Sequence, residues 1–131
     1  MRNEFTLPEQ DQLFCNAQNL ESERIVCSGM QWLLIHHFAL PEGYNCKETT
    51  VAIMIPPGYP VAALDMAYFY PGLSRTDGKP IAALSLQNID SKPFQRWSRH
   101  RTAANPWRPG IDDISTHMFL VDYWIQRELH K

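Results

Sequence analysis

Four short apolar runs, separated by turn residues, fill the first half of this 131-residue chain. Short runs that are rich in β-branched and aromatic residues are typical of strands, and Gly, Pro and Asn mark the turns between them. PPGYP at 56–60 ends the strongest run, because proline has no N–H to donate to a neighbouring strand. The sequence therefore predicts a four-stranded antiparallel meander. Its strands are ERIVCSG, MQWLLIHHFAL, TTVAIMI (49–55) and ALDMAYFYP (63–71).

Helical patterns flank these strands. Residues 8–19 predict a short helix with a thin apolar face. A longer amphipathic helix is expected from Ile114, because apolar side chains recur along one face. Asp112 and Asp113 stand at its start, where carboxylates can cap free N–H groups or, alternatively, orient an incoming lysine or a histidine. The fold class is α+β, in a single domain spanning 1–131, with a helix covering one face of the sheet. The apolar face consists of Ile114, Met118, Val121, Ile125 and Leu129.

Charge and composition exclude several kinds of protein. A formal net charge of −2 gives no general affinity for nucleic acid or membranes. The three cysteines, Cys15, Cys27 and Cys46, form no metal-binding pattern, and scattered cysteines fit a reducing compartment. The N-terminus is too polar for a signal peptide, and no apolar run approaches the ~20 residues that span a bilayer. We therefore expect a cytoplasmic protein that needs no cofactor and no metal.

Residues 72–112 show little regular pattern and predict a long structured loop. Loops of this length in a compact domain usually have a function. The end of this loop, QRWSRHRTAANPWRP at 95–109, holds two tryptophans, four arginines and one serine but no acidic residue. Its concentration of charge and aromatic rings makes it the candidate functional segment.

The order of these features resembles that of the ubiquitin-conjugating enzymes. In that fold a Tyr-Pro motif follows the third strand and a Trp-x-Pro motif precedes the next helix. Here Tyr59-Pro60 and Trp107-Arg108-Pro109 stand in those places. LPEGYN, IPPGYPVAALDMAYFYP and RWSRHRTAANPWRPGIDD are similar, more narrowly, to the prokaryotic ubiquitin-conjugating family E. The resemblance covers about residues 25–129, and the two helices that usually end the fold have no counterpart in this chain.

The resemblance directs attention to Ser98. Ubiquitin-conjugating enzymes keep a catalytic cysteine a short distance before the Trp-x-Pro motif, and Ser98 occupies that position, nine residues before Trp107. None of the three cysteines is near. The family's His-Pro-Asn motif is also missing, and its nearest counterpart is Gln87-Asn88. Asn88 would then donate a hydrogen bond to the oxyanion, and a plain turn residue is the alternative role.

A serine nucleophile needs a neighbouring base, because its hydroxyl does not ionise at neutral pH. His100 lies two residues beyond Ser98, and in an extended segment the two side chains share one side. Nearby arginines would keep the imidazole neutral and stabilise an oxyanion. The C-terminus of a ubiquitin-like protein would thus form an oxyester on Ser98. The alternatives are a catalytically inactive module that binds the ubiquitin-like protein or the activating enzyme, and a serine that is only a loop residue.

The basic side chains around Ser98 predict a partner-binding surface. Guanidinium groups bind carboxylates, so an acidic partner or a carboxylate tail would dock there. Nucleic acid stacked on the tryptophans is the rival interpretation, but no basic bias exists elsewhere in the chain. The resemblance implies a ubiquitin-like protein, an activating enzyme and a protein target as partners, in a bacterial pathway such as antiphage defence, with no nucleic acid and no membrane. The predicted partner-binding residues are Arg96, Trp97, Arg99, Arg101 and Arg108.

Overall fold

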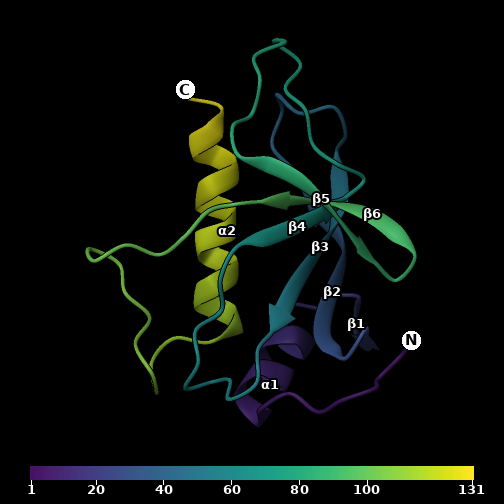
Figure 1. Ribbon diagram of the computed structural model, residues 1–131, viewed down its shortest axis with the longest axis vertical. Coiled ribbons are helices and arrows are strands. Elements are labelled where there is room, and N and C mark those ends of the chain that lie inside the picture. The colour runs from purple at the N-terminus through teal and green to yellow at the C-terminus, as the bar shows by residue number, and fades with distance from the viewer.

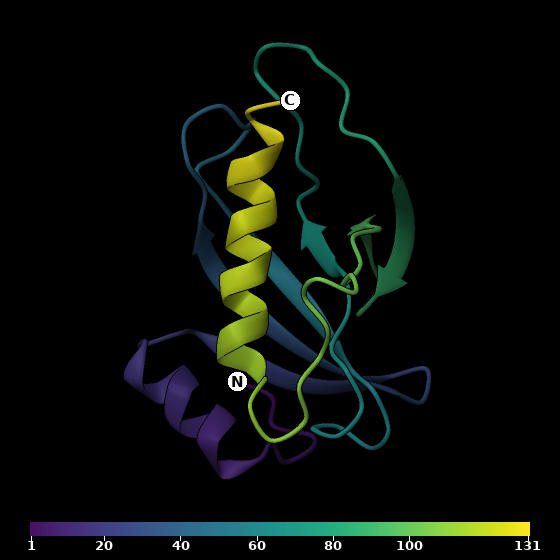
Figure 2. The same cartoon turned by 90° about the vertical axis from the view of Figure 1, so that its left-hand side faces the viewer.

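The computed structural model describes residues 1–131 and contains one antiparallel sheet of six strands, with helix α2 across one face (Figures 1 and 2). The strands lie in the order β1-β2-β3-β4-β6-β5. The predicted α+β class is confirmed, and a helix or strand lies within each predicted segment, although the fourth strand covers only Ala67–Tyr70 of the predicted 63–71. None of the helices is long and apolar enough to cross a lipid bilayer. The elements are α1 (Glu9–Ala17), β1 (Ser22–Cys27), β2 (Met30–Ala39), β3 (Glu48–Ile55), β4 (Ala67–Tyr70), β5 (Leu84–Ile89), β6 (Lys92–Trp97) and α2 (Ile114–Glu128).

The prediction of a four-stranded sheet followed by one long loop is wrong, because residues 84–97 form a β-hairpin. Asp90 and Ser91 make its two-residue turn with φ angles of 54° and 61°, the left-handed region that suits the twist of paired strands. Strand β6 then pairs with β4, so the hairpin extends the sheet instead of crossing it as a loop. Burial of Phe94 and Trp97 anchors β6 in the sheet.

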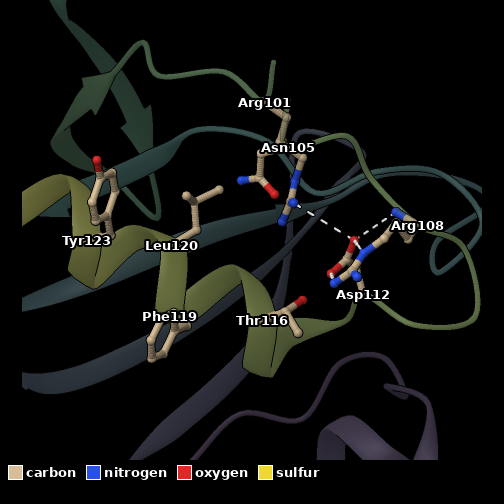
Figure 3. Close-up of a pocket in the computed structure, with 8 residues that line it drawn as sticks. All are labelled: Arg101, Asn105, Arg108, Asp112, Thr116, Phe119, Leu120 and Tyr123. Carbon is tan, nitrogen blue, oxygen red and sulfur yellow. Dashed lines mark hydrogen bonds and ion pairs between the residues drawn. The ribbon is translucent and has the colours of Figure 1, made fainter. Parts of the chain in front are cut away.

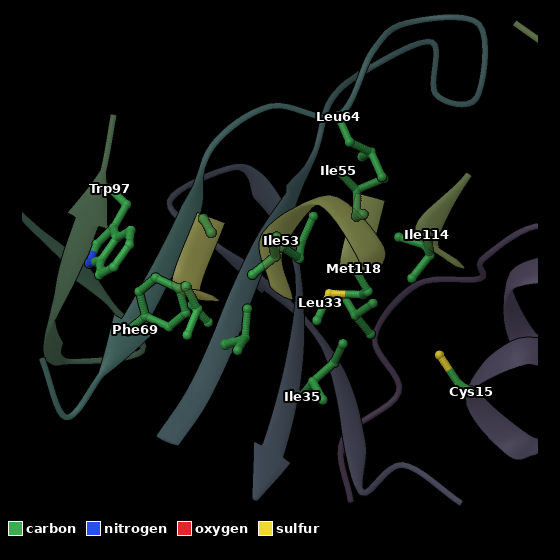
Figure 4. Close-up of a cluster of buried hydrophobic side chains, with 14 of the residues drawn as sticks. Cys15, Leu33, Ile35, Ile53, Ile55, Leu64, Phe69, Trp97, Ile114 and Met118 are labelled. Carbon is green, nitrogen blue, oxygen red and sulfur yellow. The ribbon is translucent and has the colours of Figure 1, made fainter. Parts of the chain in front are cut away.

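The main hydrophobic core lies between the sheet and α2 (Figure 4). Trp97 of β6 and Phe69 of β4 pack edge to face in it, with ring centroids 5.2 Å apart. The predicted apolar face of α2 is confirmed: Ile114, Val121 and Ile125 are fully buried in this core. The expected capping role of Asp113 is also confirmed. Its carboxylate accepts a hydrogen bond from the backbone N–H of Thr116 at 3.2 Å, while its own N–H donates to the Thr116 hydroxyl at 3.0 Å.

The opposite face of the sheet holds a second, smaller core without a covering helix. This cluster runs across the whole face, from Ile25 of the edge strand β1 to Ile89 of the other edge strand β5. The sheet curls enough for one side chain, Arg2, to contact residues at both edges. Arg2 spans this closure. Its guanidinium lies 3.1 Å from Glu23 and 2.7 Å from Asp90. The hydrogen bond from Arg2 lowers the pKa of Glu23 to about 2.

Candidate functional site

The Tyr-Pro and Trp-x-Pro motifs contact each other in the structure. The indole N–H of Trp107 donates to the carbonyl oxygen of Pro60 at 3.1 Å, and the Trp107 and Tyr59 rings lie 6.2 Å apart. The Tyr59 hydroxyl donates to the buried carboxylate of Asp11 at 2.7 Å. The other oxygen of Asp11 accepts from the backbone N–H of Ile114 at 3.1 Å, at the first turn of α2. One carboxylate thus ties α1, the Tyr-Pro motif and α2 together.

Ser98 directly follows β6, at the point where the chain leaves the sheet. Its backbone N–H donates to the carbonyl of Ala83 at 3.1 Å, which extends the hairpin pairing by one residue. The side chain is partly exposed, and no hydrogen bond joins its hydroxyl to His100. The backbone of Ser98 is therefore held in place by the hairpin, while its side chain is partly open to solvent.

His100 forms a hydrogen bond that its sequence position does not reveal. Its Nδ1 lies 2.9 Å from a carboxylate oxygen of Asp65, in the segment before β4. Arg101 and Trp107 line the same shallow cavity as this pair. A carboxylate on Nδ1 fixes the tautomer of an imidazole and leaves Nε2 available to accept a proton. Asp65 lies 35 residues from His100 along the chain, and no motif in the sequence marks it.

Asn88 lies at the opposite end of the hairpin from Ser98. It pairs with Pro93, and Ser98 comes five residues after Pro93, directly beyond the end of β6. At ~3.3 Å per residue in a strand, the two residues stand roughly 16 Å apart along the strand direction. Asn88 therefore cannot donate to an oxyanion at Ser98, and its exposed position next to the turn fits the alternative role.

Three of the five predicted partner-binding residues serve the protein's own fold. Trp97 is completely buried, so its predicted place on a docking surface is wrong. Arg99 stacks over the Trp97 ring and donates to the carboxylate of Glu128 at 3.2 Å. The Nε of Arg96 donates to the hydroxyl of Ser85 at 2.9 Å, across the hairpin. A basic, aromatic sequence pattern cannot separate such internal contacts from a binding surface.

Arg101 and Arg108 converge on the buried carboxylate of Asp112. The backbone N–H of Arg108 donates to it at 2.7 Å and its guanidinium at 3.3 Å, while Arg101 stands 4.0 Å away. Burial acts to raise the pKa of Asp112, but the hydrogen bonds from Arg108 outweigh it and hold that pKa below its usual value. Asp112 thus orders the Trp-x-Pro segment and does not face an incoming lysine.

The structure offers no obvious metal site: no group of three or more His, Cys, Asp or Glu side chains gathers closely enough to hold an ion. The cysteines are all free, and Cys15 is buried in the main core.

A curled antiparallel sheet backed by a helix, with the Tyr-Pro and Trp-x-Pro motifs in contact, is the arrangement expected of a ubiquitin-conjugating-like domain. The chain belongs to prokaryotic E2 family E, whose family model matches residues 7–128. The match includes Ser98, His100 and both motifs. Membership indicates a role in bacterial ubiquitin-like conjugation and, in general terms, interaction with a ubiquitin-like protein and an activating enzyme. No curated protein and no solved structure matches this chain.

Proposed function

We propose that this protein carries a ubiquitin-like protein as an oxyester on Ser98 and transfers it to a target, as a step of a bacterial conjugation pathway in the cytoplasm. The observation that carries the proposal is the Asp65–His100 pair, 2.9 Å between Nδ1 and the carboxylate, two residues from Ser98. Family membership supplies the reaction class, and the spacing of Ser98 from Trp107 supplies the position.

The first step is an acyl exchange from the thioester of an activating enzyme. The Ser98 hydroxyl oxygen attacks the thioester carbonyl carbon, the C–S bond breaks, and the enzyme thiolate leaves. The proton of the hydroxyl passes to Nε2 of His100, directly or through one water, and then to the departing thiolate. Asp65 stabilises the imidazolium that forms in between.

The second step transfers the acyl group to an amine of the target. The amine nitrogen attacks the ester carbonyl carbon, and the C–O bond to Ser98 breaks. His100 takes one proton from the amine and returns a proton to the serine oxygen, so that Ser98 is regenerated. An ester is a weaker acyl donor than a thioester. Transfer to the amine would therefore depend more strongly on the base His100 than the same step does in an enzyme that uses cysteine.

A second candidate function is a binding module without chemistry. The specific observation that favours it is the Ser98 hydroxyl, which makes no hydrogen bond to His100. In that case the same surface would hold the ubiquitin-like protein or the activating enzyme, and Ser98 would be an ordinary loop residue.

An adduct assay separates the two candidates. The protein is incubated with ATP and with a ubiquitin-like protein and an activating enzyme of its own pathway. We expect an adduct that resists thiol reductant and breaks in hydroxylamine. Ser98→Ala should abolish it, Ser98→Cys should make it sensitive to reductant, and Ser74→Ala, which alters an exposed serine distant in sequence, should leave it intact. Partner binding without an adduct in any variant would establish the inactive module.

The role of His100 can be tested separately from that of Ser98. Asp65→Asn should keep the adduct but slow its formation, because the imidazole loses the carboxylate that orients it and stabilises the imidazolium formed during the reaction. A rate equal to that of the unmodified protein would remove Asp65 from the mechanism.

A further inference from the structure

A groove runs between α2 and the segment that contains the Trp-x-Pro motif (Figure 3). It encloses about 430 Å³. Polar side chains of residues 101–112 form one wall, and Phe119, Leu120 and Tyr123 of α2 form the other. In Figure 3 the Leu120 side chain points towards Asn105 and Arg101, so the apolar and basic walls approach each other.

Arg101 is a buried cation with poorly satisfied donors. Its side chain is only 10% exposed, and its Nε has no hydrogen-bond partner. The other guanidinium nitrogens make only long contacts, 3.5 Å to Nδ1 of His117 and 4.0 Å to Asp112. Buried donors normally find close acceptors, because leaving them unpaired costs free energy. The guanidinium also stacks over the Trp107 ring, 4.8 Å from its centroid, so its two terminal nitrogens are the donors with hydrogen-bonding capacity left for an anion.

The charges around the groove favour a negatively charged ligand. Arg101 and Arg108 bring two positive charges, and Asp112 brings one negative charge. His117 adds none at neutral pH, because burial lowers its pKa to about 4 and its Nε2 donates to the carbonyl of Met66 at 2.8 Å. The residues that line the groove therefore carry one more positive than negative charge, and a carboxylate would offset that excess. Asp65, which lines a neighbouring cavity with Arg101, is a second carboxylate that acts on this guanidinium.

The apolar wall is unusually exposed for side chains of this size. Phe119 is 79% exposed and Tyr123 53% exposed, although both lie on a helix whose other face is core. Large apolar side chains grouped beside a polar rim are typical of interaction sites. The α2 side of the groove, which also includes Thr116, runs from Thr116 to Tyr123, about 10 Å along a helix at 1.5 Å per residue. That length matches about three residues of extended peptide.

We propose that this groove binds a short extended segment of a partner protein, in which an acidic side chain stands next to large apolar side chains. The carboxylate of the segment accepts hydrogen bonds from Arg101 and Arg108, and its apolar side chains cover Phe119 and Leu120. Ser98 does not line this groove, and peptide binding needs no acyl transfer, so the proposal stands whether or not Ser98 is acylated.

Selection from a displayed library of random peptides tests the proposal. The library is panned against the protein, and an enriched peptide is synthesised with a fluorescent label for anisotropy titrations. We expect enriched peptides to combine Asp or Glu with Leu, Phe or Trp. Replacing the acid by its amide should weaken binding about tenfold or more, as loss of a charge-assisted contact at an interface centre does.

Variants of exposed side chains locate the bound peptide. Phe119→Ser and Arg108→Gln should each weaken binding about tenfold, whereas Arg127→Gln, an exposed arginine further along α2, should not. Ser98→Ala should bind the peptide normally, which keeps this result independent of the oxyester. Arg101→Lys tests the buried cation, with circular dichroism to confirm its fold.

Three outcomes would overturn the proposal. The first is enrichment of peptides without acidic residues, or no enrichment at all. The second is a peptide that binds the Phe119→Ser and Arg108→Gln variants as tightly as the unmodified protein. The third is concentration-dependent dimerisation in sedimentation experiments that Phe119→Ser abolishes, because the groove would then be an interface between two copies of this chain.

Discussion

Replacing Tyr59 by phenylalanine should destabilise the protein through a single lost hydrogen bond. The Tyr59 hydroxyl donates to the carboxylate of Asp11 at 2.7 Å, and Asp11 is completely buried. A hydrogen bond to a charged group contributes about 1.5–3 kcal/mol, so we expect Tyr59→Phe to lower the free energy of unfolding by about 2 kcal/mol. The phenyl ring keeps the packing against Trp107, which limits the change to the hydroxyl.

The loss should depend on pH with a definite sign. Burial raises the pKa of Asp11, and the hydrogen bond from Tyr59 opposes that rise. A raised carboxyl pKa means that stability falls as pH increases from the ordinary Asp value through the higher value of the folded protein. Without Tyr59 the pKa of Asp11 rises further, so the deficit of Tyr59→Phe should be small in acid and grow towards neutral pH.

Urea denaturation across this pH range measures the effect, with unchanged denaturant slopes as the test that the folded state is intact. Tyr123→Phe is the matched control, because the Tyr123 side chain is half exposed and forms none of the hydrogen bonds described above. Equal stability losses in the two variants, or a Tyr59→Phe deficit that shrinks towards neutral pH, would refute the reasoning.

Two further predictions concern the closure of the sheet and the end of α2. Arg2→Ala should cost about 1 kcal/mol at neutral pH, a small value because the Arg2 side chain is 42% exposed to solvent. Since Arg2 lowers the pKa of Glu23 from 4.5 to about 2, this loss should fade as pH falls between those values in urea titrations. Gly43→Ala should cost about 2 kcal/mol or more, because φ is +116° and the new Cβ would lie 2.9 Å from Leu129. Gly78→Ala, with a positive φ but open space around it, should cost less. Urea denaturation of both variants measures the difference, and the reverse order would exclude the steric explanation.

The strongly periodic elements of the fold could be predicted from the sequence. β2 and β3 are runs of β-branched and large apolar residues, and α2 has a regular apolar face, so their local pattern and their burial agree. The hairpin β5–β6 could not be predicted in the same way. LSLQNI mixes apolar and polar residues without a sustained alternation, KPFQRW is largely polar and contains a proline, and Asp90-Ser91 lacks the glycine that usually marks such a turn. Their pairing depends on burial of Phe94 and Trp97, which is a tertiary effect.

The sequence predicted the candidate site only as far as spacing along the chain allows, and it did not reveal contacts between distant segments. Spacing from Trp107 was enough to single out Ser98, and the adjacency of His100 suggested a base. Asp65 could not be found, because it reaches His100 from a segment 35 residues away. For the arginines, closeness in sequence was misleading, because it suggested that all four lie on one surface. In the structure Arg96 bonds Ser85 across the hairpin and Arg99 bonds the buried Glu128, so neither joins Arg101 and Arg108.

The hydrogen bond between Asp11 and Ile114 affects the order in which the protein folds during synthesis. The two residues are 103 positions apart, so ribosomal synthesis exposes α1 long before its partner exists. Until Ile114 has emerged, the carboxylate of Asp11 remains hydrated and α1 has only β-strands to contact. Closing so long a loop is entropically costly and contributes little until the sheet is in place. Docking of α1 against α2 should therefore come late, after the meander has formed, and the completed Tyr-Pro motif should be among the last parts of the protein to become ordered.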